Sequence, residues 1–179
     1  MTAFDEGAGD LVQYEVDHGV ALITWNRRER NNAWSPELEE AYFGRLRQAE
    51  ADHDVRVIVV TGAGRHFCPG TDMRHLASVA DGNRRSDPEL REPQTLPTTI
   101  LKPIIAAIKG SCAGTGFIQA SVCDVRFADS DARITPAFVR RGILSEHVRA
   151  FLLPRLVGLG VALDILLSAR VLSGTEAHR

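Results

Sequence analysis

The sequence predicts an α/β fold whose functional surface lies at the ends of buried strands. Three short apolar runs, with the sequences ALITW, VIVVTG and IIAAIKG, have the length and composition of buried strands. Each run leads directly into a loop of polar or small residues, and a helix is expected beyond each loop. The order strand, strand, helix therefore recurs along the chain, and we expect residues 1–179 to form a single domain.

The first part of the chain is expected to form two strands and a long helix. Leu11–Val16 alternates between apolar and polar residues, and Val20–Trp25 follows it after a three-residue turn. Ser35 is placed as an N-cap with Pro36 at the first helical position, and apolar residues then recur at helical spacing as far as Asp52.

The remaining elements follow the same reasoning. Further strands are expected at Val55–Thr61, Ile104–Ile108, Val125–Ala128 and Arg133–Thr135. Helices are expected after the capping residue Asp72, before Lys102-Pro103, over the apolar run Gly116–Cys123, up to Val157, and over Val161–Arg170. The polar residues 80–93 are expected to form a mobile surface loop.

Composition argues against several classes of function. The chain has 44% hydrophobic and 25% charged residues and a net charge of −2, which gives no reason to expect binding to nucleic acid or to a membrane surface. No apolar run approaches the roughly 20 residues of a membrane helix, and the acidic start does not resemble a signal peptide, so we expect a cytoplasmic protein. The three cysteines form no CxxC pair and no histidine has a ligand-like partner, so neither a disulfide nor a metal site is expected.

Two glycine-containing segments are the candidate functional loops. CPGTD at 68–72 and AGTGF at 113–117 each place small residues between a buried strand and a helix. Such segments expose backbone N–H groups, and two of these groups converging on one oxygen atom form an oxyanion hole. The alternative is that the glycines only allow a helix to pack tightly on a strand.

Two other motifs fit less well. VVTGAGRHF has Phe67 where a dinucleotide-binding fingerprint needs its third glycine. GSCAG has Cys112 where a nucleophile elbow needs serine, and a nucleophilic cysteine would need an electropositive site and a partner base.

From about residue 11 to residue 178, the chain resembles the crotonase (enoyl-CoA hydratase/isomerase) superfamily. The resemblance is carried by WNRRERNNAWSPELEE, by IIAAIKGSCAGTGFIQASVCDVRFAD and by LLPRLVGLGVALDILLSARVLSG. It implies a crotonase-like spiral of β-β-α units, with a C-terminal helical segment that is truncated relative to the family. It also implies an acyl-CoA thioester substrate, an enolate intermediate, no cofactor besides the coenzyme A of the substrate, and a homo-trimer or hexamer.

The resemblance also implies the roles of individual residues. The backbone N–H groups of Thr71 and Thr115 would form the oxyanion hole, and Arg27 and Arg30 would lie near the phosphates or adenine of coenzyme A. The other implied substrate-binding residues are Ala33, Gly70, Gly114, Phe117 and Phe138.

The acid–base residues depart from the family pattern. The two glutamates of classical hydratases fall at Ile118 and Phe138, which are apolar. The resemblance places a carboxylate instead at Glu146, just after the RRG stretch, while the neighbouring His147 is expected at the surface or in a cap. A single carboxylate favours enoyl-CoA isomerisation, or an atypical hydration, over classical two-glutamate hydration. The alternative is a catalytically degenerate member that binds acyl-CoA or only oligomerises.

Overall fold

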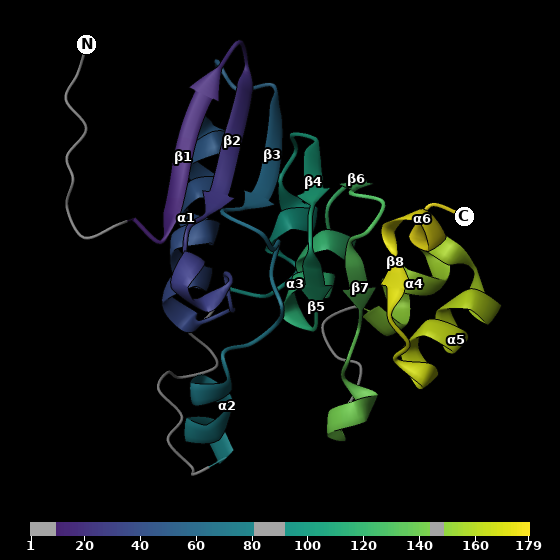
Figure 1. Cartoon of the computed structure of the whole chain (residues 1–179). Helices are drawn as coiled ribbons and strands as arrows, with labels where there is room; N and C mark the ends of the chain where they lie inside the picture. Colours follow the sequence, from purple (N-terminus) through teal and green to yellow (C-terminus); the bar gives the residue numbers. More distant parts are fainter. Residues whose placement is uncertain (1–9, 81–91, 144–148) are drawn as a thin grey trace.

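The main sheet of the computed structural model has five strands, in the order β1-β2-β3-β4-β6 (Figure 1). The structure describes residues 10–80, 92–143 and 149–179. β1 and β2 form an antiparallel hairpin, while the pairs β2–β3, β3–β4 and β4–β6 are parallel. The strands are β1 (Val12–Asp17), β2 (Val20–Trp25), β3 (Val57–Gly62), β4 (Ile104–Ile108) and β6 (Val125–Ala128).

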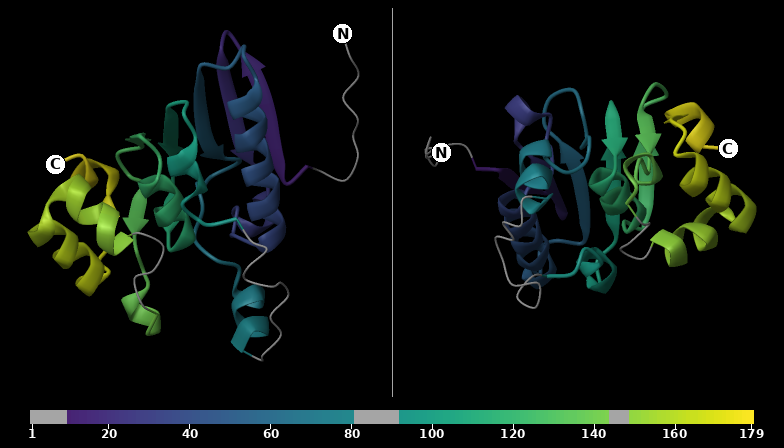
Figure 2. Two further views of the ribbon diagram at one scale, coloured as in Figure 1. Left: turned by 180° about the vertical axis from the view of Figure 1, so that it is seen from behind. Right: turned by 90° about the horizontal axis from the view of Figure 1, so that it is seen from below.

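One face of this sheet packs against helix α1 (Pro36–Ala51), which lies against β1 and β2 (Figure 2). Along the three central strands every second side chain is buried, as the two-residue period of a strand requires. The Oγ of Ser35 accepts a hydrogen bond from the Leu38 N–H at 3.3 Å, so the predicted N-cap of the helix is confirmed. The aromatic core at one end of the sheet includes Trp25, whose ring centroid lies 5.3 Å from that of Trp34 and 4.6 Å from that of Phe67.

A second, three-stranded sheet has the order β5-β7-β8 and leads to the C-terminal helices (Figure 1). Its strands are β5 (Ser111–Ala113), β7 (Arg133–Thr135) and β8 (Leu172–Ser173). The helices of this part of the chain are α3 (Thr115–Ser121), η4 (Val139–Arg141), α4 (Arg149–Val157), α5 (Leu159–Ser168) and α6 (Gly174–Ala177).

Most of the predicted elements are confirmed, with shifts at their ends. The helix expected after Asp72 is α2 (Met73–Ala80), and the Arg74 N–H donates to Asp72 Oδ1 at 3.0 Å as a cap. The helix expected before Lys102-Pro103 is a single 3₁₀ turn, η3 (Leu96–Thr99). β5, β8 and α6 were not predicted, because elements of two to four residues carry no readable period. The loop expected at 80–93 falls largely outside the described residues.

Candidate active site

Two loops that are far apart in the sequence meet through their backbones. The Cys68 N–H donates to the Ser111 carbonyl at 2.9 Å, and the Ala113 N–H donates to the Cys68 carbonyl at 2.9 Å. A Cβ atom on Gly116 would lie only 2.3 Å from the Cys68 carbonyl oxygen, so a larger residue there would push the loops apart. Tight backbone packing therefore accounts for part of the small-residue run 110–116.

The glycines that precede the two threonines have backbone conformations that other residues rarely adopt. Gly70 has φ +110° and Gly114 has φ +53°. A Cβ atom on Gly70 would lie 3.2 Å from the Ala113 carbonyl oxygen, and one on Gly114 would lie 3.5 Å from the Gly70 Cα. The two glycines therefore face each other across the junction of the loops.

Thr71 and Thr115, the residues predicted as oxyanion-hole donors, are brought into contact. Their hydroxyl oxygens lie 2.8 Å apart and share a hydrogen bond. Among the described residues, neither the Thr71 N–H nor the Thr115 N–H donates to a protein acceptor. Both amides are thus free to bind an acceptor from outside the protein, while their role as an oxyanion hole stays a prediction.

Trp34 holds the loop that carries Thr71 through two backbone hydrogen bonds. Its N–H donates to the Gly70 carbonyl at 2.8 Å, and its carbonyl accepts from the Asp72 N–H at 2.8 Å. The backbone of Thr71 is therefore fixed on both sides by hydrogen bonds of its neighbours to one residue.

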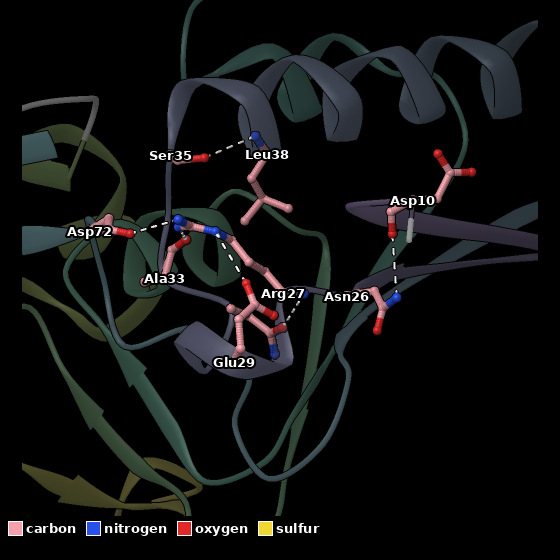
Figure 3. Close-up of polar contacts among 9 residues, drawn as sticks. Asp10, Asn26, Arg27, Glu29, Ala33, Ser35, Leu38 and Asp72 are labelled. Atoms are coloured by element: carbon pink, nitrogen blue, oxygen red, sulfur yellow. Dashed lines mark hydrogen bonds and ion pairs between the residues drawn. The ribbon is translucent and has the colours of Figure 1, made fainter. Parts of the chain in front are cut away.

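Arg27 is paired inside the protein (Figure 3). Its Nη2 lies 2.8 Å from Asp72 Oδ2, and its Nη1 donates to the Ala33 carbonyl at 2.9 Å. The hydrogen bond from the Arg74 N–H, followed by the Arg27 guanidinium, holds the pKa of Asp72 below its ordinary value. The guanidinium of Arg27 thus contributes to positioning the loop that carries Thr71. Its contact with coenzyme A, like that of Arg30, stays a prediction.

Sequence reasoning missed Asn32, which joins the arginine-rich loop to the loop after β3. Its side chain is fully buried and uses both of its polar groups. Oδ1 accepts from the Arg27 N–H at 3.0 Å, and Nδ2 donates to the carbonyls of Ala63 at 2.9 Å and His66 at 2.8 Å. Asn32 has a φ of +62°, which asparagine tolerates better than most residues. The Asn-Asn pair was therefore the feature of the sequence that could have pointed to this position.

A chain of polar contacts among three buried side chains and the half-buried Gln94 was also missed. Trp34 Nε1 donates to Glu39 Oε2 at 2.8 Å, and Gln94 Nε2 donates to the same oxygen. Gln119 Nε2 donates to Gln94 Oε1 at 2.6 Å. These contacts connect Trp34, which holds the first loop, to helix α3, which carries the second.

The apolar residues at the two classical glutamate positions differ in their surroundings. Ile118 is buried in α3, as is the neighbouring Phe117, which packs in the hydrophobic core. The Phe138 ring is half-buried, and its Cζ lies 4.0 Å from where a Cβ on Gly114 would be. Phe138 therefore lies beside the second loop. Glu146, the predicted acid–base residue, lies outside the described residues.

The three cysteine thiols are buried and protonated at neutral pH. Burial raises the pKa of Cys68 and of Cys123 to about 12 and that of Cys112 well above its ordinary value. None of them therefore has the thiolate character of a nucleophile.

Within the described ranges, no group of three or more potential metal ligands occurs. In the same part of the chain, no helix has the length and apolar character needed to cross a bilayer.

Comparisons with known proteins show which family the chain belongs to. The family model described as enoyl-CoA hydratase/isomerase matches residues 15–179, so the chain belongs to that family, also called the crotonase superfamily. A solved enoyl-CoA hydratase structure from Mycobacterium marinum is 43% identical, with a TM-score of 0.78, over 95% of this chain and 76% of that one. The structure of an enoyl-CoA hydratase/isomerase from Acinetobacter baumannii has a TM-score of 0.88 at 27% identity, over 96% of this chain and 71% of that one. The predicted crotonase-like fold is thereby confirmed.

Curated relatives include both hydratases and isomerases. A probable enoyl-CoA hydratase of Mycobacterium leprae is 38% identical over 89% of this chain and 58% of its own length. The 1,2-epoxyphenylacetyl-CoA isomerase of Escherichia coli is 32% identical over 94% of this chain and 66% of its own length. The chain thus spans about three fifths to two thirds of the length of these relatives.

Proposed function

We propose that this protein binds acyl-CoA thioesters and stabilises their enolates at the junction of the two loops. The observation that carries the proposal is the contact between Thr71 and Thr115, whose backbone N–H groups have no protein acceptor in the described part of the chain. A thioester oxygen held by both amides would receive two hydrogen bonds of about 2.7–3.1 Å, and these bonds strengthen as negative charge develops on the oxygen. Family membership supports the same class of substrate.

We assign the acid–base step to Glu146, because the residues at the two classical positions, Ile118 and Phe138, cannot carry a proton. One carboxylate can remove a proton from the carbon next to the thioester and return it to the carbon two positions further along. The double bond then moves without addition of water, so isomerisation of an enoyl-CoA is the favoured reaction and an atypical hydration is the next candidate.

The test compares Glu146→Gln with wild type on 2-enoyl and 3-enoyl thioesters, following both isomer and hydrate. Turnover should fall roughly 100-fold or more while acyl-CoA affinity stays nearly unchanged, because glutamine keeps the size of the side chain but cannot accept the proton. Glu15→Gln, at an exposed position of β1, is the control and should leave turnover unchanged. Equal rates for wild type and Glu146→Gln would exclude Glu146 from the mechanism.

The second candidate is a family member that binds acyl-CoA, or only oligomerises, without turnover. The apolar residues at both classical glutamate positions favour it. Measured binding of an acyl-CoA with no wild-type turnover of any enoyl thioester would select this candidate.

The proposal includes a homo-trimer or hexamer in the cytoplasm, acting in fatty acid metabolism. Large apolar side chains on α4 and α5 are exposed in the single chain, with Phe151 58%, Leu159 65% and Leu167 69% exposed. Sedimentation at micromolar concentration tests the assembly, and a monomer alone would contradict it.

A further inference from the structure

We infer that the Thr71 and Thr115 hydroxyls act as a positioning pair, which sets the distance between the two amides that hold the thioester oxygen. This inference rests on the proposed function and deepens it. The donors of an oxyanion hole are backbone N–H groups, which any residue except proline supplies. Here both donor positions carry a hydroxyl as well, and the two oxygens lie 2.8 Å apart.

Backbone hydrogen bonds hold each donor loop, but to different neighbours: Trp34 holds Gly70 and Asp72, while the Gly114 N–H donates to the Thr135 carbonyl at 3.2 Å. The loops are joined upstream of the donors, at the two hydrogen bonds between Cys68 and the segment 111–113. Between that joint and the donors lie Gly70 and Gly114, both at positive φ. Glycine has few steric limits on its backbone angles, so it does not by itself direct the N–H group of the residue that follows. A second connection, between the two donor residues themselves, fixes their spacing directly.

The hydroxyl hydrogen bond is that second connection. With the backbone bridge on one side and the hydroxyl pair on the other, the two loops form a closed ring that includes both glycines. Thr115 is only 8% exposed, so its hydroxyl is largely shielded from competing water. A hydrogen bond shielded in this way holds its partners at a fixed separation more firmly than one exposed to solvent.

Either hydroxyl can donate in this pair, and the other then accepts. Both threonines are therefore needed for one interaction, and removing either one removes all of it.

The test uses Thr71→Val and Thr115→Val, which keep the shape of threonine without the hydroxyl, and the double variant. Each single variant should lower kcat about five- to tenfold, the usual value of one hydrogen bond, with little change in KM. The double variant should be about as slow as either single variant, because the two hydroxyls form one bond. Thr71→Ser and Thr115→Ser keep the hydroxyl and should lose much less kcat than the valine variants. Thr61→Val, which removes a hydrogen bond of 2.9 Å to the Ala107 carbonyl between β3 and β4, is the control for general loosening and should leave kcat unchanged.

A second readout does not depend on turnover. Butyryl-CoA labelled with carbon-13 at its thioester carbonyl has no double bond to react, and the infrared stretch of the bound carbonyl reports its hydrogen bonds. Binding to wild type should shift the stretch to lower wavenumber, and both valine variants should reverse part of that shift. A purely structural role would lower the melting temperature and leave the stretch unchanged.

The outcomes separate this inference from the proposed function. If the carbonyl stretch in the valine variants equals that in wild type and their losses of kcat add, the positioning pair is overturned and the proposed function stands. If the valine variants reverse the wild-type shift but wild type shows no turnover, the pair is supported in a protein that binds acyl-CoA and does not catalyse. Failure of wild type to bind butyryl-CoA would overturn both.

Discussion

The Arg27 guanidinium lies 2.8 Å from the carboxylate of Asp72, the residue directly after Thr71. The side chains of both residues are mostly buried, with 19% of Arg27 and 9% of Asp72 exposed. Because Arg27 also donates to the Ala33 carbonyl, one cation connects the loop 26–33 to the loop that carries a proposed oxyanion donor.

The Arg27–Asp72 pair predicts how stability depends on pH. The pKa of Asp72 is depressed in the folded protein. The charged carboxylate therefore contributes fully to the free energy of unfolding above the pKa of an unfolded aspartate, about 3.9, and this contribution is lost as pH falls through the lower pKa of the folded state. Asp72→Asn should lower the free energy of unfolding at pH 7 by about 1–3 kcal/mol, with a deficit that shrinks below about pH 4. The measurement is urea denaturation of wild type and variant between pH 3 and pH 7.

The matched control for this prediction is Glu29→Gln. Glu29 Oε1 is 3.9 Å from the same guanidinium, but the side chain is 70% exposed. Its removal should change stability by less than about 0.5 kcal/mol at any pH in this range. A deficit for Asp72→Asn that stays constant from pH 7 to pH 3 would contradict the assignment to the charged carboxylate.

A pair of glycine substitutions tests the close approach of the two loops. Gly116→Ala would put a Cβ atom 2.3 Å from the Cys68 carbonyl oxygen and 2.8 Å from Cys68 Cβ. The backbone of one loop must then move, at a cost of about 1–3 kcal/mol or more in the free energy of unfolding. Gly44→Ala, in the exposed part of α1 with no atom within 4 Å of the new Cβ, should instead stabilise by up to about 1 kcal/mol. Denaturant unfolding of both variants checks the signs, and a neutral Gly116→Ala would refute the predicted clash.

Asn32 and Asn31 offer a comparison of adjacent asparagines that both have positive φ. Asn32→Asp would replace the Nδ2 donor with an oxygen facing the carbonyls of Ala63 and His66, in a fully buried place. We expect a loss of about 3 kcal/mol or more, since a buried charge would face two acceptors. Asn31→Asp introduces the same charge at an exposed position and should change stability by less than about 0.5 kcal/mol. Thermal unfolding at pH 7 distinguishes them, and similar melting temperatures for the two variants would contradict the role of Asn32.

The strands were predictable from sequence where β-rich runs are bounded by turn residues. Ile104–Ile108, which lies between Pro103 and the glycine-rich segment, and Val125–Ala128 were predicted to the residue. The strand Ser111–Ala113 was not, because three small residues between glycines look like a loop until a partner strand is known.

The candidate site was predictable only in part. The two loops were identifiable because each places glycine between a strand and a helix. The hydroxyl contact between Thr71 and Thr115 and the Arg27–Asp72 pair were not, because the partners are 44 and 45 residues apart and no local pattern connects them. The role of Asn32 was hidden for the same reason, since its acceptors lie 31 and 34 residues further along the chain.

Helix α5 allows the same substitution to be tested at two buried alanines with opposite backbone conformations. Ala169 is the C-cap of the helix at φ +48°, in the left-handed region, while Ala162 lies in the helix interior. Both are 1% exposed, so each Ala→Gly change removes a similarly buried methyl group. At Ala169 glycine relieves backbone strain of about 1–2 kcal/mol, whereas at Ala162 it adds a helix-propensity cost of about 1 kcal/mol. Ala169→Gly should therefore be more stable than Ala162→Gly by about 2 kcal/mol in the free energy of unfolding, measured by urea denaturation. Equal stabilities would mean that the left-handed cap carries no strain that glycine can relieve.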